Sequence, residues 1–185
     1  IGMAVAHEDD APPQGKPPER LGQVYFPVTC DDVAQKEFNR AMALFHSFWF
    51  DPAKQSFAKV LELDAQCAMA NWGIAFMSMG NPFAWPANPT AMKAAAAAAD
   101  KAQQLGGKST RERDYIEAMT AFFKDWENID HRTRAVAWEK AMAQVAQRYS
   151  DDVEAKILHA LLLAATALPT DKTFANQLKA AAILE

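Results

Sequence analysis

Residues 50–75 read FDPAKQSFAKVLELDAQCAMANWGIA, and this stretch carries the clearest indication of the fold. Asp51-Pro52 gives a helix N-cap followed by proline at the first helical position, where its missing N–H costs nothing. Small residues at Ala53 and Ala75 would let helix backbones approach closely, and Phe57 would fill the gap between successive pairs of helices. One pair cannot bury its apolar face alone, so neighbouring pairs are expected to stack.

Start and stop signals of the same kind recur along the chain. Asp32-Val33-Ala34-Gln35 and Ser109-Thr110-Arg111-Glu112 have the capping-box spacing, and Asn88-Pro89 repeats the cap-plus-proline pair. No segment shows sustained period-two alternation, so the sequence predicts an all-α protein. The predicted helices cover about residues 32–48, 51–63, 66–79, 88–106, 109–126, 130–149 and 151–167, with a last helix capped by Asp171.

The stretch at residues 50–75 resembles a tetratricopeptide repeat (TPR). Lys59–Asp64, with Ala53 and Phe57 before it, is similar to the second half of a repeat, and Ala68–Ala75 is similar to the first half of the next. Ala41 stands 34 residues before Ala75, although Ala65 replaces the usual proline and Glu37 a common tryptophan. The resemblance implies a right-handed α-solenoid of antiparallel helix pairs, about eight helices, over residues 31–185.

Three short segments are also similar to those of exported bacterial TPR proteins of unassigned function. They are Phe26-Pro27-Val28-Thr29-Cys30, His46-Ser47-Phe48-Trp49 and Asn81-Pro82-Phe83. Because the last predicted helix lacks a polar capping helix after it, we expect an array truncated at its C-terminal end.

The resemblance implies that the chain binds a protein or peptide on a concave face lined by the first helix of each pair. Counting from the small packing positions Ala41, Ala75 and Ala118 places ten residues on this face: Phe38, Met42, Phe45, His46, Trp72, Phe76, Met79, Tyr115, Met119 and Phe122. This aromatic and methionine-rich set suits adaptable binding of apolar side chains. The alternative is simple burial, since large apolar residues at helical spacing are usually core, and the N-terminal arm could cover this face.

The two cysteines, Cys30 and Cys67, lie at or just ahead of successive first helices in the repeat register, which run side by side. A disulfide between them would tie the incoming arm to the second repeat and stabilise the fold by about 3–4 kcal/mol in the chain-entropy model. The alternative is two unrelated buried thiols.

Residues 1–30 are expected to form a proline-rich extended arm ahead of the helical domain at residues 31–185. Ala4-Val5-Ala6 matches the pattern cut by signal peptidase, so residues 1–6 are either a signal-peptide remnant or a cloning remnant. The first reading favours a periplasmic or secreted protein, the second leaves a cytoplasmic one open.

Several functional classes receive no support from the sequence. The net charge is −4 without a basic run, which argues against nucleic-acid binding, and the apolar stretch Ile157–Leu168 is too short to span a bilayer. No G-x-S-x-G, Walker, Rossmann or H-E-x-x-H pattern occurs, so we expect a non-catalytic module without a cofactor.

The alternative function is a small-ligand or soft-metal site in a pocket lined by methionine, histidine and the tryptophans Trp49, Trp72 and Trp85. Its candidate ligands are His46, Met42, Met77 and Met79, because thioether and imidazole groups suit copper(I). The rival interpretation of the methionines is that they fill gaps in the core.

Overall fold

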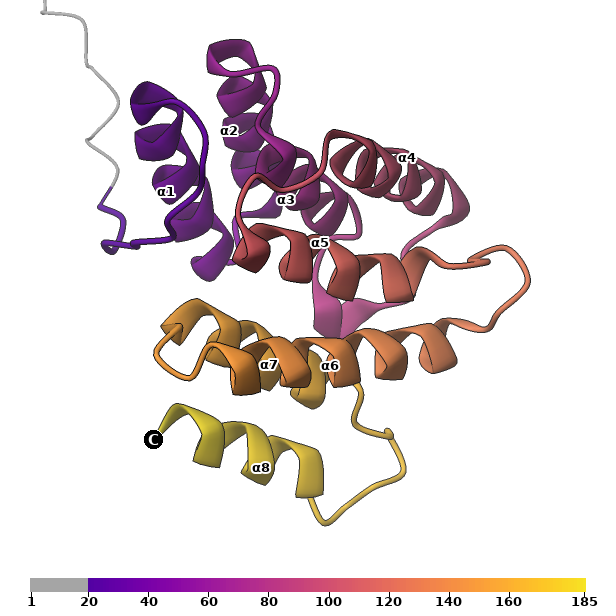
Figure 1. The fold of residues 1–185 in the computed structure, drawn as a ribbon. Coiled ribbons are helices and arrows are strands. Elements are labelled where there is room, and N and C mark those ends of the chain that lie inside the picture. The colour runs from indigo at the N-terminus through magenta and orange to yellow at the C-terminus, as the bar shows by residue number, and fades with distance from the viewer. Residues whose placement is uncertain (1–19) are drawn as a thin grey trace, which may run out of the picture.

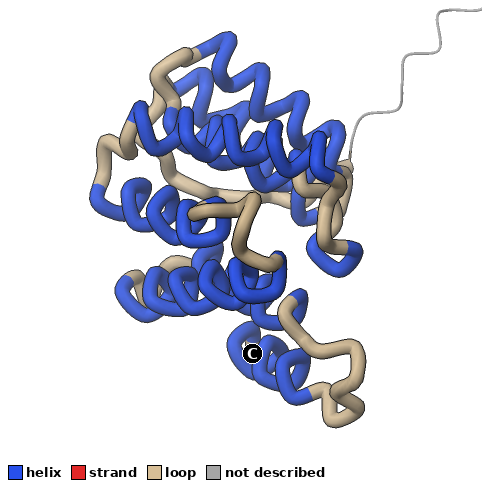
Figure 2. Tube along the Cα trace, turned by 90° about the vertical axis from the view of Figure 1, so that its right-hand side faces the viewer, coloured by secondary structure: helices blue, strands red, loops and turns tan. Residues whose placement is uncertain are grey.

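The computed structural model describes residues 20–185, and this part of the chain is all-helical, with no β-strand (Figures 1 and 2). It contains eight α-helices and one 3₁₀ helix: α1 (Asp32–His46), α2 (Phe50–Leu63), α3 (Ala68–Ser78), η1 (Pro82–Ala84), α4 (Pro89–Leu105), α5 (Thr110–Phe123), α6 (His131–Arg148), α7 (Val153–Ala165) and α8 (Ala175–Leu184). The predicted all-α class and the order of the helices are therefore confirmed for this part of the chain. Residues 1–6, predicted to be a signal-peptide or cloning remnant, and most of the predicted proline-rich arm lie outside the described residues.

Four α-helices begin with a side-chain cap at the predicted start or one residue after it. The Asn88 side chain accepts from the Ala91 N–H at 2.9 Å, and the Asp130 side chain accepts from the Thr133 N–H at 3.0 Å. Ser109 and Glu112 form the predicted capping box of α5, and Asp152 caps α7. These caps are local and satisfy N–H groups that have no partner inside the helix.

Three predicted starts are wrong in detail. α1 has Asp31 as its N-cap residue, without a side-chain cap, and α2 begins one residue before Asp51. α8 begins after Phe174 rather than at Asp171, although an Asp171 oxygen still accepts from the Ala175 N–H at 3.4 Å. The predicted capping box at Asp32 fails because the side chain of its fourth residue, Gln35, bonds to residues 26 and 28 instead.

Each helix packs on the next one along the chain, and α3 also contacts α5. The close approach depends on small residues. A Cβ atom on Gly73 of α3 would lie 2.5 Å from the Phe57 ring of α2, and Phe57 also meets Phe38 of α1 with ring centroids 5.2 Å apart. Phe57 therefore fills the space where α1, α2 and α3 meet, as the sequence indicates. α8 lies at the opposite end of the molecule from α2 (Figure 1).

The predicted disulfide between Cys30 and Cys67 is present, with the two Cα atoms 5.2 Å apart. It joins the residue before the N-cap of α1 to the N-cap of α3. The two cysteines are 37 residues apart, so the disulfide links segments that are distant in sequence. Among the described helices, none is both long and apolar enough to cross a membrane.

Candidate functional site

The structure buries nine of the ten residues predicted to line an open concave face. Each has 3% or less of its surface exposed: Phe38, Met42, Phe45, Trp72, Phe76, Met79, Tyr115, Met119 and Phe122. These nine belong to the hydrophobic core, so the alternative of simple burial holds for them. Only His46, at the end of α1, remains half-buried.

Residues 20–30 of the same chain cover part of this face. The Phe26 ring is fully buried, with its centroid 5.3 Å from Phe38 of α1, 6.0 Å from Trp72 of α3 and 5.2 Å from Tyr115 of α5. The predicted domain boundary at residue 30 thus separates groups that pack together. Phe26 fills the space that the sequence assigns to a ligand.

Side chains of α1 hold the backbone of this segment in an extended form. The Phe26 N–H donates to the Asn39 side chain at 3.1 Å, and the Val28 N–H donates to Gln35 at 2.7 Å. The Gln35 amide in turn donates to the Phe26 carbonyl at 2.8 Å. These bonds satisfy main-chain groups that lie outside any regular secondary structure.

On the other side, Glu112 of α5 clamps Thr29. One carboxylate oxygen accepts from the Thr29 N–H at 2.6 Å, and the other accepts from its hydroxyl at 2.5 Å. Burial by itself would raise the pKa of Glu112, but the hydrogen bonds from Ser109 and Thr29 outweigh it and hold the pKa below its usual value. The Glu112 carboxylate therefore caps α5 and fixes the segment at once.

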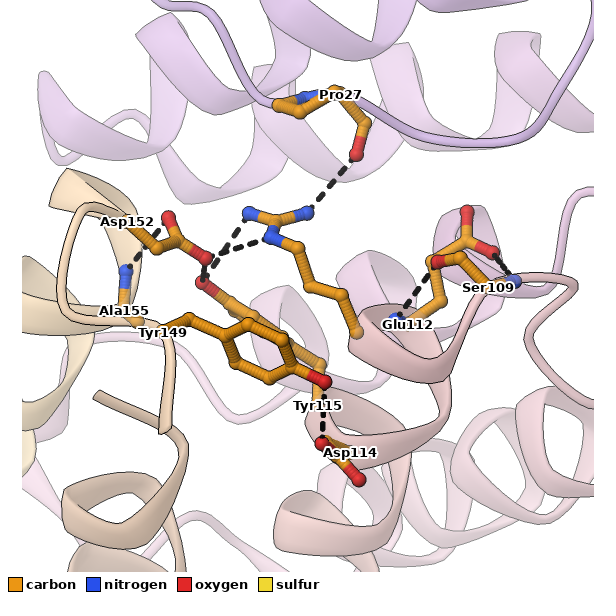
Figure 3. Close-up of polar contacts among 9 residues, drawn as sticks. Pro27, Ser109, Glu112, Asp114, Tyr115, Tyr149, Asp152 and Ala155 are labelled. Carbon is orange, nitrogen blue, oxygen red and sulfur yellow. Dashed lines mark hydrogen bonds and ion pairs between the residues drawn. The ribbon is translucent and has the colours of Figure 1, made fainter. Parts of the chain in front are cut away.

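Arg111, the residue before Glu112, connects the segment to the second half of the molecule. Its guanidinium donates to the Pro27 carbonyl at 2.9 Å and to Asp152, the N-cap of α7, at 2.6 Å. It also lies over the Phe26 ring, 4.3 Å from the centroid, and over Tyr115 at 4.7 Å. Figure 3 shows Pro27, Asp152 and Tyr115 converging on this point. A single cation thus joins three elements that are distant in sequence.

Asp152 completes the network. It accepts from the Tyr115 hydroxyl at 2.7 Å with the same oxygen that binds Arg111, and its second oxygen accepts from the Ala155 N–H (Figure 3). Burial alone would raise the pKa of Asp152, but the bonds from Arg111 and Tyr115 lower it overall. Burial, with the neighbouring Asp152, raises the pKa of Tyr115, which keeps its proton for this bond. The group is paired throughout, so its role is to hold elements together.

A cleft of about 940 Å³ opens beside this network. One wall is residues 22–25 with Pro27, and the opposite wall is the α6–α7 turn with the first turns of α7, from Arg148 to Ile157. His46 and Arg111 contribute from α1 and α5. Tyr25 and Val153 are exposed by 78% and 63%, so the cleft offers apolar surface at both walls.

His46 is the one predicted groove residue that reaches the cleft. Its Nε2 lies 2.9 Å from a carboxylate oxygen of Glu154 in α7, across 108 residues of sequence. The pair joins the C-terminal end of α1 to the N-terminal end of α7. The side chain of Glu154 is only 9% exposed, so the imidazole is its partner in a largely dry position.

Of the four residues proposed for a soft-metal site, only His46 lines the cleft. Met42, Met77 and Met79 are buried in the core, and His46 Nε2 is occupied by Glu154. In residues 20–185, no group of three or more His, Cys, Asp or Glu side chains is placed to hold a metal ion. The tryptophans of the same hypothesis differ in exposure: Trp72 is buried, whereas 52% of the Trp49 surface is exposed.

Sequence reasoning missed most of the residues that build the cleft: Arg111, Arg148, Tyr149, Asp152, Val153, Glu154 and Ile157. Asp152 and the Arg111-Glu112 pair were visible only as helix-start signals. The hydrogen bonds that these residues make outside their own helix starts span 41 to 84 residues of sequence. No pattern in the sequence indicates that the segments they join lie together.

Comparison with protein-family models, curated proteins and solved structures finds no match for this chain. The TPR resemblance therefore stays a prediction from the sequence pattern. The geometry of the cleft is therefore the basis for a proposal of function.

Proposed function

We propose that this chain is a non-catalytic helical repeat module of the TPR type, and that it binds an extended peptide or protein segment in the cleft beside Arg111. The observation that carries the proposal is the way residues 26–29 are held. An extended stretch of polypeptide is fixed between α1 and α5 by side-chain bonds to its main-chain groups, with its aromatic side chain in a buried pocket. Hydrogen bonds to the main chain combined with a pocket for a side chain are a recurring mode of peptide recognition.

The placement of the cleft supports the same proposal. Its helical residues come mainly from α1, α5 and α7, and Arg148 at the end of α6 completes the lining together with the α6–α7 turn. In a solenoid of helix pairs, alternate helices line the inner face, so a right-handed array of antiparallel pairs accounts for this set. The close packing of Phe57 on Gly73 fits the small-residue contacts of such repeats.

The chemistry of the walls favours a peptide with apolar side chains. Val153 and Tyr25 provide exposed apolar surface, while Arg148 and Asp151 provide charges at the rim. An apolar centre with a polar rim is the usual organisation of a peptide-binding surface. Arg111 and Asp152 are fully engaged with each other, so they shape the floor rather than offer a free charge.

The disulfide supports export as part of the proposal. Disulfides form and persist in oxidising compartments, and Cys30–Cys67 stabilises the position of the segment that forms the cleft wall. We propose a periplasmic or secreted location on this basis.

The test is selection of peptides on the oxidised protein from a random display library, followed by calorimetric titration of the selected sequences. Val153→Asp should weaken binding by about tenfold or more, because a charge replaces apolar surface in the wall. Aspartate at the first position of α7 suits the helix dipole, so this variant should fold. Phe83→Ser, outside the cleft lining, is the matched control. Absence of any selected peptide, or equal binding to both variants, would refute the proposal.

A further inference from the structure

We propose that residues 20–25 form a strap that an extended peptide ligand displaces, so that the ligand lies between α1 and α7 in its place. This inference rests on the proposed function, because it describes how the same groove admits its ligand. It concerns only the first part of the N-terminal segment. Residues 26–30 stay fixed.

The two parts of the segment differ in their polar contacts. Residues 26–29 exchange hydrogen bonds with the side chains of Gln35, Asn39, Arg111 and Glu112. No hydrogen bond, ion pair or ring contact within the described part of the chain involves residues 20–25. Among the described residues, the polar bonds of this segment therefore begin at the Phe26 N–H.

The apolar contacts of residues 20–25 are also few. Only Leu21 and Val24 pack against the core, and both are partly exposed. Tyr25 is 78% exposed, and a Cβ atom added to Gly22 would meet no other atom within 4 Å. A segment with little buried apolar area and no hydrogen bonds opens at low free-energy cost.

Open space lies on both sides of this strap. A cavity of about 640 Å³ separates it from α1, where Asn39, Arg40 and Ala43 form the lining. The cleft of about 940 Å³ separates it from α7. Residues 22–25 line both spaces, so their displacement would join the two into one groove.

The strap indicates what its replacement should contain. Leu21 and Val24 are its two core-facing side chains, three residues apart. A ligand that takes the same path would place two aliphatic side chains at that spacing, and a longer ligand would reach Val153 in the opposite wall. The hinge is the backbone immediately before Phe26, because that ring and its N–H are both fixed.

Hydrogen–deuterium exchange on the full oxidised chain, without ligand, tests whether the strap opens. We expect the amides of residues 22–25 to exchange close to the rate of an unstructured peptide. Those of Phe26, Val28 and Thr29 donate hydrogen bonds and should be slower by about a hundredfold or more. Equal protection across residues 22–29 would overturn the proposal whether or not any peptide binds.

A double substitution tests whether a ligand takes the strap's place. Leu21→Ser/Val24→Ser removes the two apolar contacts, and Gln23→Ser, an exposed strap position, is the control. Peptides selected on the wild-type protein should bind the double variant more tightly, by about three- to tenfold, because less free energy goes into opening the groove. Unchanged or weaker affinity would mean that the strap is a fixed wall, and would overturn the inference while leaving peptide binding intact. Melting curves verify that both variants fold.

Discussion

At the two ends of the described chain, regular secondary structure and burial in the core do not go together. Residues 26–30 have no regular secondary structure, yet Phe26 is fully buried among rings from α1, α3 and α5. α8 is a regular helix at the other end, yet Leu178 and Leu184 are exposed by 66% and 57%. Helix formation therefore does not measure how much a segment contributes to this fold. Buried contacts and side-chain hydrogen bonds do.

The largest expected effect comes from Phe26. Phe26→Ala should lower the free energy of unfolding by about 3–5 kcal/mol, because it leaves a cavity where three helices meet. Urea denaturation followed by circular dichroism measures the change. A loss below about 1 kcal/mol would mean that the segment only covers the core, and the comparison with α8 would fail.

The disulfide should come next. Replacing both Cys30 and Cys67 by serine is expected to lower stability by about 3 kcal/mol, mostly by freeing the unfolded chain. The same urea experiment with wild-type protein in reductant provides an independent measurement. If the oxidised and reduced proteins unfold at the same denaturant concentration, the disulfide does not anchor the segment.

Two arginine–aspartate pairs allow a matched comparison of burial. Arg111→Ala should cost about 2–3 kcal/mol, because it leaves Asp152 without its charged partner in a position where both side chains are under a fifth exposed. Arg148→Ala removes a similar pair with Asp114, but Arg148 is 61% exposed, so we expect a clearly smaller loss of stability. Equal effects would show that burial does not distinguish the two pairs.

Acid should weaken the attachment of the segment. The pKa values of Glu112 and Asp152 are lowered in the folded protein, so both groups bind protons more readily in the unfolded chain. Their stabilisation is complete above the unfolded values of about 4, and it is lost as the pH falls below them towards the folded pKa values. Denaturation at several pH values should show this loss. Glu112→Gln should be less stable at neutral pH and lose less between about pH 5 and pH 2.

The smallest effect is expected at the other end of the molecule. Leu178→Ser in α8 should change the free energy of unfolding by less than about 0.5 kcal/mol, since the side chain is mostly exposed already. Measured under the same conditions as Phe26→Ala, it sets the scale of the comparison. A loss above about 2 kcal/mol would mean that α8 is integrated more firmly than its exposure indicates.

The contact between Phe48 and Phe83 was not predicted from the sequence. Phe48 follows α1 with a positive φ of 60°, which is costly for an aromatic residue, and its ring stacks on Phe83 of the loop after α3. Both rings are about half exposed. Nothing in the helix periodicity pairs these two residues, because Phe48 lies in the turn after α1 and Phe83 lies in the short 3₁₀ helix η1.

The sequence predicts the helices to within a few residues of their ends, and the side-chain caps at Asn88, Ser109 and Asp130, because these signals act within four residues. It also indicated the disulfide partners, given the repeat register. Tertiary structure alone decided that Phe26 enters the core and that Arg111 meets Asp152. It also decided that nine of the ten predicted groove residues are buried. The physical reason is range: capping and periodicity are local, whereas the Thr29–Glu112 and His46–Glu154 contacts join residues 83 and 108 positions apart and exist only once the helices have packed.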